Sequence, residues 1–280
     1  MDLKIFVVFS SPAGSTRLVA ETIKDAFIQR KVEVNLSDLG LQRDNSGLLE
    51  RIHQAGQHAC LFIGSPVYRD AAVPPVVDFI ASLPKITGAT AVPFVTWGQA
   101  CSGVALWQMA GLLMQKGFKI AAAAKVAAVH SLMWQAADPA GKGHPDQADL
   151  DRIKDLVTVL QSRCESAGLA PLELETLDYQ PGQRAGQMKQ KITAPRRTVP
   201  KKVNTEACTR CGVCEAACPA AAISLNPYPG FDQSCFDCFN CVRLCPEAAI
   251  EPAVSIQEMA QYIRQRVKTI NEQPLTQIFL

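Results

Sequence analysis

The hydrophobic positions of the N-terminal half form short apolar runs that alternate with longer amphipathic stretches. The runs are rich in Val, Ile, Phe and Ala, as expected of strands buried on both faces. Predicted strands are 3–9, 32–36, 59–64, 91–96 and one within 118–129, and predicted helices are 15–30, 75–83, 103–116 and 146–167. This alternation predicts an α/β fold with a doubly wound, five-stranded parallel sheet, whose ligands bind at the carboxyl ends of the strands.

The helical periodicity fades after residue 168, and the stretch 180–204 is rich in Gln, Pro and basic residues, which is typical of a linker. We therefore divide the chain into a first domain at 1–168, a linker at 169–204, a cysteine-rich domain at 205–252 and a C-terminal helical tail at 253–280. The tail begins with a capping-box pattern, Ser255 and Glu258. Its apolar stripe indicates packing on the chain itself or a homodimer contact.

Composition and charge narrow the classes of function. The 280 residues are 48% hydrophobic and 19% charged, so the chain can bury a core, and the net charge of +2 argues against a dedicated nucleic-acid binder. The longest run of small apolar residues, 120–129, is interrupted by Lys125 and is too short to cross a membrane. Basic residues of the linker, among them Lys189, Lys201 and Lys202, either steer an acidic partner or only keep the linker solvated.

Eight of the 11 cysteines lie between Cys208 and Cys245, in two copies of the pattern C-x2-C-x2-C-x3-C-P. Such clustering inside a larger chain indicates metal ligation by thiolates rather than a disulfide framework, and it requires a reducing compartment. We therefore expect a cytoplasmic protein. Two zinc sites are the alternative, but a third cysteine at two-residue spacing and a following proline are not typical of zinc.

Residues 206–251 resemble the bacterial-type ferredoxin family. The resemblance implies a small α+β domain with two [4Fe–4S] clusters and one-electron transfer at low potential. In such proteins the fourth cysteine of each run ligates the other cluster. The expected ligands are therefore Cys208, Cys211, Cys214 and Cys245 for the first cluster, and Cys235, Cys238, Cys241 and Cys218 for the second.

A loop rich in hydroxyl groups joins the first strand to the first helix. Its candidate phosphate-binding residues are Ser10, Ser11, Ala13, Gly14, Ser15 and Thr16. Hydroxyl groups and free N–H groups at a helix N-terminus can bind a phosphate, although the same residues can simply cap the helix. The loop is similar to the FMN-phosphate signature of flavodoxins, which implies that Ser11, Ser15 and Thr16 hold the FMN phosphate. Ala13 departs from that signature, since many flavodoxins carry threonine there.

The loops after the third and fourth strands lie where a flavodoxin places its isoalloxazine ring. Their candidate residues are Pro66, Val67, Tyr68, Arg69, Thr96, Trp97, Gly98, Gln99 and Gly103. Tyr68 and Trp97 either stack on the ring or are buried beneath the loops. His130, after the fifth strand, is either near the flavin or structural.

Together the two halves resemble the fused flavodoxin–ferredoxin family of electron carriers. The resemblance implies single-electron transfer between two [4Fe–4S] clusters and FMN, and on to protein redox partners. The alternative is an FMN-dependent reductase that acts on a small acceptor such as a quinone, with the clusters as its electron supply. The sequence contains no unambiguous catalytic acid or base, and no DNA-binding element that would suit a redox sensor.

Overall fold

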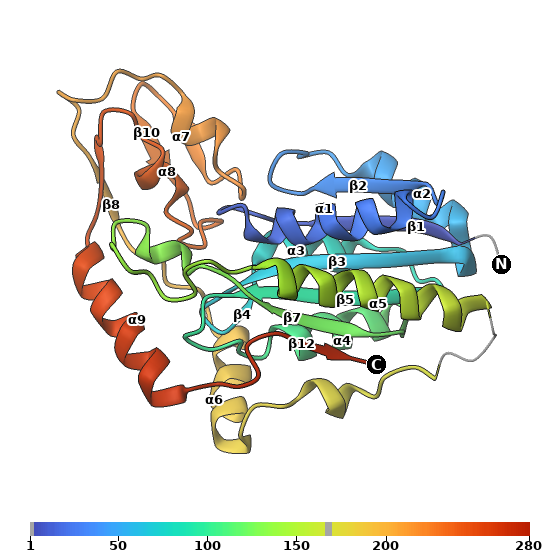
Figure 1. Cartoon of the computed structure of the whole chain (residues 1–280). Helices are drawn as coiled ribbons and strands as arrows, with labels where there is room; N and C mark the ends of the chain where they lie inside the picture. Colours follow the sequence, from blue (N-terminus) through green and yellow to red (C-terminus); the bar gives the residue numbers. More distant parts are fainter. Residues whose placement is uncertain (1–2, 166–169) are drawn as a thin grey trace.

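The computed structural model describes residues 3–165 and 170–280, which form a large α/β domain with a smaller lobe at one end (Figure 1). The central sheet has the order β12-β7-β5-β3-β1-β2, and its parallel strands follow the 2-1-3-4-5 order of flavodoxin-like folds. The predicted fold class is confirmed. The strands are β1 (Lys4–Phe9), β2 (Val34–Asp38), β3 (Ala59–Tyr68), β4 (Ala71–Ala72), β5 (Thr90–Trp97), β6 (Lys119–Ile120), β7 (Ala123–Ala127) and β12 (Gln277–Phe279).

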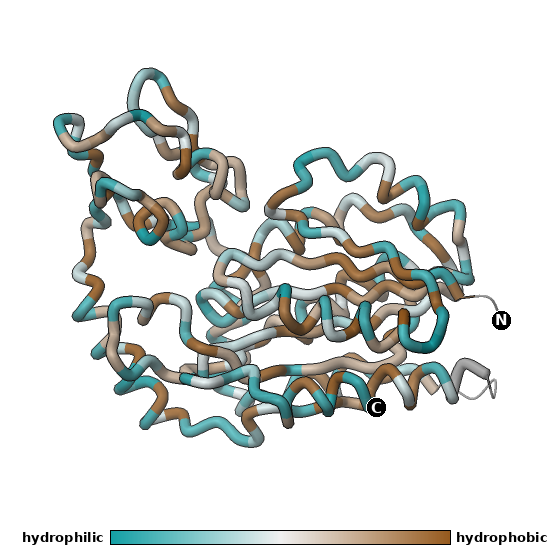
Figure 2. The backbone as a smooth tube through the Cα atoms, turned by 45° about the horizontal axis from the view of Figure 1, so that its top comes forward, coloured by the Kyte–Doolittle hydropathy of each residue, from teal (hydrophilic) through white to brown (hydrophobic). Residues whose placement is uncertain are grey.

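Helices cover both faces of the sheet because successive strand residues point to opposite sides. In β1, Ile5 and Val7 pack in the same hydrophobic cluster as α1 and α5, whereas Phe6 and Val8 pack in the cluster of the opposite helices. Figure 2 shows the resulting hydrophobic strands at the centre of the domain. The helices are α1 (Ser15–Ile28) and α5 (Gln147–Glu165) on one face, and α2 (Ser46–Ala55), α3 (Pro74–Ser82) and α4 (Ala105–Gln115) on the other.

The C-terminal segment contains more than the predicted helical tail. Helix α9 (Ile256–Ile270) begins as predicted, with the Ser255 hydroxyl accepting a hydrogen bond from the Glu258 N–H. The chain then returns to the large domain, where β12 pairs antiparallel with β7 at the sheet edge. The last segment therefore belongs to the same sheet as the first strand.

The predicted linker also contains regular structure. It includes the 3-10 turn η3 (Leu174–Leu177), helix α6 (Gly182–Thr193) and strand β8 (Lys201–Val203), whereas its expected start at residue 169 lies outside the described residues. Helix α6 buries Ala185 and Met188 in one cluster with Cys101 and Val104. An amphipathic helix that packs on the large domain was not expected from so polar a sequence.

The small lobe lies over the carboxyl ends of the parallel strands (Figure 1). Its elements are β8, α7 (Val213–Ala216), β9 (Ile223–Leu225), β10 (Pro229–Phe231), α8 (Asn240–Arg243) and β11 (Ile250–Pro252). Strand β9 pairs antiparallel with β10, and β8 with β11. The Arg243 guanidinium donates to the Pro12 carbonyl at 2.8 Å, so the lobe contacts the loop that precedes α1.

Candidate functional site

The loop between β1 and α1 presents hydroxyl groups and backbone N–H groups to a small cavity. Helix α1 begins after Gly14, which has φ 97° and provides no side-chain cap. The Arg17 N–H donates to Ser11 Oγ at 2.9 Å, which leaves the Ser11 O–H free to donate elsewhere. Thr16 is buried and its hydroxyl lies 2.8 Å from that of Thr96, so the loop is fixed to the end of β5.

Ser10 follows β1 at the start of this loop. Within residues 3–165 and 170–280, the Ser10 hydroxyl is buried and has no hydrogen-bond partner. A buried hydroxyl without a partner costs free energy, about 1–3 kcal/mol, that a bound acceptor would recover. Phosphate oxygen is such an acceptor, and the positive end of the helix dipole at the start of α1 favours its negative charge. Ser11, Ser15 and Thr16 line the cavity at the start of α1, so the loop suits a phosphate group, whereas Ser10 does not line the cavity itself.

Ten of the predicted cofactor residues line a cavity of about 30 Å³ at this loop. They are Ser11, Ala13, Ser15, Thr16, Pro66, Val67, Tyr68, Thr96, Trp97 and Gly98. Arg69 lines a neighbouring, larger cavity instead. Ser10, Gly14, Gln99 and Gly103 line neither of these two cavities. The structure thus brings together most of the predicted residues, while their role in binding stays a prediction.

Tyr68 occupies the boundary between the two cavities. Its hydroxyl lies 2.7 Å from Ser131 Oγ, and its ring meets Phe236 of the small lobe edge to face. Burial, with a smaller contribution from the thiol of Cys238, raises the pKa of Tyr68 well above its usual range. Tyr68 is therefore a neutral aromatic group that contacts both the large domain and the small lobe.

Trp97 is held beneath its loop. Its side chain is 1% exposed and its indole N–H donates to the Leu275 carbonyl at 2.8 Å, next to β12. That bond fixes the indole against the C-terminal segment, so the alternative of a buried aromatic describes Trp97 better than ring stacking does. Sequence periodicity gave no sign of this partner, because it lies 178 positions away.

Two glycines permit close backbone approach beside the cavities. A Cβ atom at Gly98 would lie 2.6–2.7 Å from atoms of His130. At Gly103, φ is +64° and a Cβ would lie 2.0 Å from the Asp70 carbonyl oxygen. Gly103 therefore shapes the loop without contacting the cavity itself.

His130 lines both cavities, which settles its position but not its role. Burial, assisted by the nearby positive charge of Arg266, lowers the pKa of His130 to about 4. The imidazole is thus neutral at pH 7, and its Nδ1 accepts a weak hydrogen bond from the Leu132 N–H at 3.4 Å. Ser131 and Val129 also line the smaller cavity and were not among the predicted residues.

The two cysteine runs have matching backbone conformations. Each contains αL residues after its first cysteine, Arg210 and Gly212 in one copy and Asp237 and Phe239 in the other. The short helices α7 and α8 follow, and then Ala221 and Ala248 have φ 50° and 48°. The sequence duplication is therefore a structural duplication.

The cysteines gather in the two sets that the sequence predicts. Cys208, Cys211, Cys214 and Cys245 line one cavity of about 20 Å³. In the other set, burial raises the pKa of Cys238 and Cys241 to about 12, with contributions from the thiols of Cys218 and Cys235. Because thiols bind metal as thiolates, metal binding at these buried cysteines would release protons.

Backbone N–H groups point at a sulfur atom in each copy. The Ala222 N–H donates to Cys218 Sγ and the Ala249 N–H to Cys245 Sγ, both at 3.3 Å. Such bonds stabilise thiolate and tune the potential of a cluster. The small, buried alanines also allow the backbone to approach the sulfur closely.

A charged cluster lies beside Cys235. Lys201, whose side chain is 2% exposed, places Nζ 3.4 Å from Cys235 Sγ and 3.0 Å from Asp237 Oδ1. Asp237 also pairs with Arg69 at 2.7 Å, across the boundary between lobe and large domain. Lys201 is therefore not a solvated linker lysine that could steer a distant partner.

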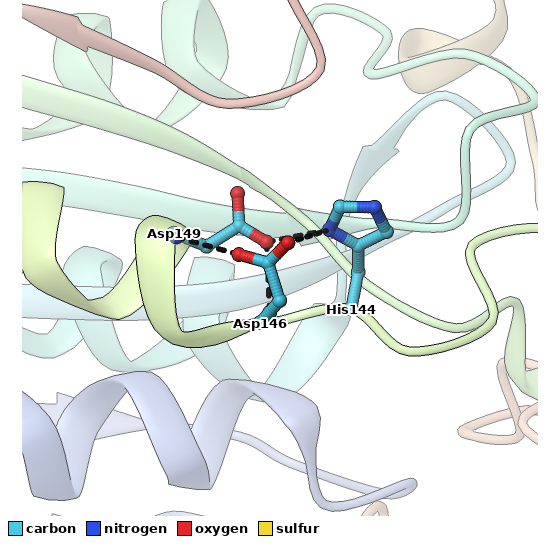
Figure 3. Close-up of side chains that lie close together, drawn as sticks. All are labelled: His144, Asp146 and Asp149. Atoms are coloured by element: carbon cyan, nitrogen blue, oxygen red, sulfur yellow. Dashed lines mark hydrogen bonds and ion pairs between the residues drawn. The ribbon is translucent and has the colours of Figure 1, made fainter.

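His144, Asp146 and Asp149 form a second group of potential ligands (Figure 3). His144 Nδ1 lies 2.6 Å from Asp149 Oδ2, and the Thr276 hydroxyl donates to Asp149 Oδ1 at 2.6 Å. Thr276 in turn accepts from the Ala127 N–H at 2.9 Å. These bonds attach the start of α5 to the C-terminal segment, and they account for the group as a structural anchor.

Comparison with known proteins supports an iron–sulfur site in the cysteine-rich region. Residues 201–224 match the family of the 4Fe-4S binding domain, which covers the first cysteine run. No curated protein matches the chain.

Solved structures similar to this chain include three flavoproteins or oxidoreductases. One is the rubredoxin oxygen:oxidoreductase from Desulfovibrio gigas, with 19% identity and a TM-score of 0.47; the match covers 58% of this chain and 36% of that one. A flavodoxin from the domain Archaea has 20% identity and a TM-score of 0.43, with 58% and 99% covered. An NADH:FMN oxidoreductase, in its apo form, has 18% identity and a TM-score of 0.42, with 68% and 100% covered.

The strand order and the cysteine site together define the class of protein. The chain joins an α/β domain with the flavodoxin-like strand order to a region that matches the 4Fe-4S binding domain, and this region supports an iron–sulfur-linked redox role. None of the described helices combines the length and apolar character needed to span a bilayer.

Proposed function

We propose that this chain passes single electrons between two [4Fe–4S] clusters and one FMN, and on to protein redox partners. The observation that carries the proposal is the contact between the second cysteine run and the predicted flavin loop. Phe236 packs on Tyr68, and Asp237 pairs with Arg69. One side of a predicted cluster site therefore lies against the predicted flavin site, as direct transfer within one chain requires.

The duplication supports two clusters rather than one. The match to the 4Fe-4S binding domain ends at residue 224, but residues 235–250 repeat its backbone conformation and its N–H···S bond. The eight cysteines of the two runs would hold the clusters, with Cys218 and Cys245 exchanged between them. The buried Ala222 and Ala249 would keep water from the sulfur atoms.

The phosphate loop supports FMN. Ser10, Ser11, Ser15 and Thr16, with the N–H groups at the start of α1, would hold the phosphate, and the absence of a hydroxyl at Ala13 would not remove those backbone donors. When bound, FMN accepts two electrons and releases them one at a time, whereas a cubane cluster carries one. Tyr68 and the loop after β5 would orient the ring near the small lobe.

A second candidate function is favoured by the larger cavity beside Tyr68, of about 460 Å³, which lies within the size range of sites for small organic ligands. An FMN-dependent reductase would receive a small acceptor there, with the clusters as its electron supply. Turnover of a soluble quinone by the reduced holoprotein tests this alternative. Because thiolate-bound clusters need a reducing compartment, we propose a cytoplasmic location for the protein under either function.

The decisive experiment is anaerobic purification with iron, sulfide and flavin quantified per chain. We expect about eight irons, about eight sulfides and one FMN. C245S and C218S each remove the one cysteine of a run that is expected to ligate the other run's cluster. Each variant should therefore lose the electron paramagnetic resonance signal of a different cluster. C60A, which alters a cysteine outside both runs, is the control. Zinc without sulfide, or loss of the same cluster in both variants, would contradict the proposal.

A further inference from the structure

A cavity of about 460 Å³ lies between three parts of the chain that are distant in sequence. The large domain contributes residues of the loops after β3, β5 and β7, the small lobe contributes Phe236, Asp237 and Phe239, and helix α9 contributes the third wall. Lys191 and Val199, from the segment before the lobe, also line the cavity. The α9 residues are Met259, Tyr262, Ile263 and Arg266. In Figure 1, α9 descends from the small lobe along the end of the sheet. No sequence pattern assigned this helix to a site.

This cavity adjoins the smaller cavity at the loop between β1 and α1. Val67, Tyr68, His130 and Ser131 line both cavities. A ligand whose phosphate lies at the start of α1 can therefore extend past Tyr68 into the larger space. The walls there are mainly apolar and aromatic, which suits a flat ring system.

Arg266 is one of the charged residues that line this cavity, and one of its N–H groups has no partner among the described residues. Its guanidinium pairs with Asp70, which is 7% exposed. Within residues 3–165 and 170–280, Arg266 Nε is buried and has no hydrogen-bond partner. An orphaned N–H of a charged group is costly, and a ligand acceptor would satisfy it.

We propose that α9 forms the outer wall of the flavin-ring site, and that Arg266 Nε donates a hydrogen bond to an acceptor on the heteroatom edge of the ring. This inference rests on the proposed binding of FMN and assigns the C-terminal helix a part in it. The flavin would then lie between Tyr68 of the large domain and α9, beside the second cysteine run. Binding of FMN would fix α9 against the large domain.

The test is a titration of flavin-free protein with FMN, in which quenching of the flavin fluorescence reports binding. Relative to the unaltered chain, R266Q should raise the Kd about tenfold to a hundredfold, since a charge-assisted hydrogen bond is lost. R264Q, an exposed arginine on the same helix, should leave the Kd unchanged. The double variant D70N/R266Q avoids leaving a buried carboxylate unpaired, and it should show the same weakening as R266Q.

Hydrogen exchange provides a second measurement that does not depend on activity. Addition of FMN should slow amide exchange in α9 of the unaltered chain, and much less in R266Q. If the unaltered chain binds FMN tightly while R266Q and D70N/R266Q bind equally well, and α9 gains no protection, the inference is wrong and the proposed function stands. If the unaltered chain binds no FMN, the proposed function itself fails.

Discussion

The ring of Tyr68 meets the ring of Phe236 edge to face, with centroids 5.8 Å apart and planes at 84°. Tyr68 ends β3 of the large domain, and Phe236 follows the first cysteine of the second run. Two segments separated by 168 positions are thus in contact at the place where electrons would pass between the predicted centres. The ion pair between Arg69 and Asp237 fixes the neighbouring residues of the same two segments.

Truncation of Phe236 should loosen this contact. F236A removes a ring that is 4% exposed, and we expect a loss of about 3 kcal/mol in the free energy of unfolding. The rate of electron transfer from the clusters to FMN, measured by stopped-flow spectroscopy, should fall at the same time. F236L keeps most of the volume and should behave nearly as the unaltered chain does. An F236A variant with unchanged stability and unchanged flavin reduction would show that the contact is not needed.

The fold was predictable because its signals are local. The alternation of buried strands and amphipathic helices gave the parallel sheet, and the spacing of cysteines gave two groups that the structure brings together. Helix α2 was missed because only Leu48 and Ile52 bury deeply in it. Within these limits, strand and helix positions followed the sequence to within a few residues.

Long-range partners were not predictable. The pairing of β12 with β7 depends on a three-residue strand whose composition is unremarkable, and the antiparallel register is set by contacts such as Thr276 with Ala127. Likewise, Lys201 belongs to a polar stretch in sequence but is buried by the folding of the small lobe around Phe231 and Phe239. Tertiary packing decides both cases, and no local pattern reports it.

The neutral state of His130 should make stability depend on pH. Its pKa is about 4 in the folded protein and near 6.5 when unfolded, so the unfolded state binds more protons between these values. Stability is therefore highest above pH 6.5 and falls on acidification. For His130 we expect a loss of about 1 kcal/mol between pH 7.5 and 5.5. Chemical unfolding should show this slope reduced in H130Q, and an unaltered slope would contradict the assignment.

The buried pair of Lys125 and Glu272 should be a large contributor to the attachment of the C-terminal segment. Their side chains are 1% and 8% exposed, and Nζ lies 2.7 Å from Oε1. K125M leaves the Glu272 carboxylate buried without its cation, so we expect a cost of about 3–5 kcal/mol in chemical unfolding. The double variant K125M/E272Q should recover much of this loss, because no charge remains buried. K119M, at an exposed position, should be neutral.

Lys201 should raise the reduction potential of the predicted second cluster relative to the first. Its ammonium is 3.4 Å from Cys235 Sγ, and with Arg69 it outweighs the negative charge of Asp237. Positive charge favours the reduced cluster, which carries one more electron. At an effective dielectric constant near 20, removal of one charge at such a distance corresponds to a shift on the order of 200 mV for a one-electron couple.

The matched pair K201M and K202M separates this effect from a general change in charge. Lys202 is the next residue and is exposed, so screening by water should leave both potentials unchanged in K202M. K201M should lower the reduction potential of one cluster only. A redox titration monitored by electron paramagnetic resonance measures both potentials. The cluster that shifts should be the one lost in C218S, because that cysteine belongs to the same set. A shift of the other cluster, or equal shifts in both variants, would overturn the assignment of Lys201.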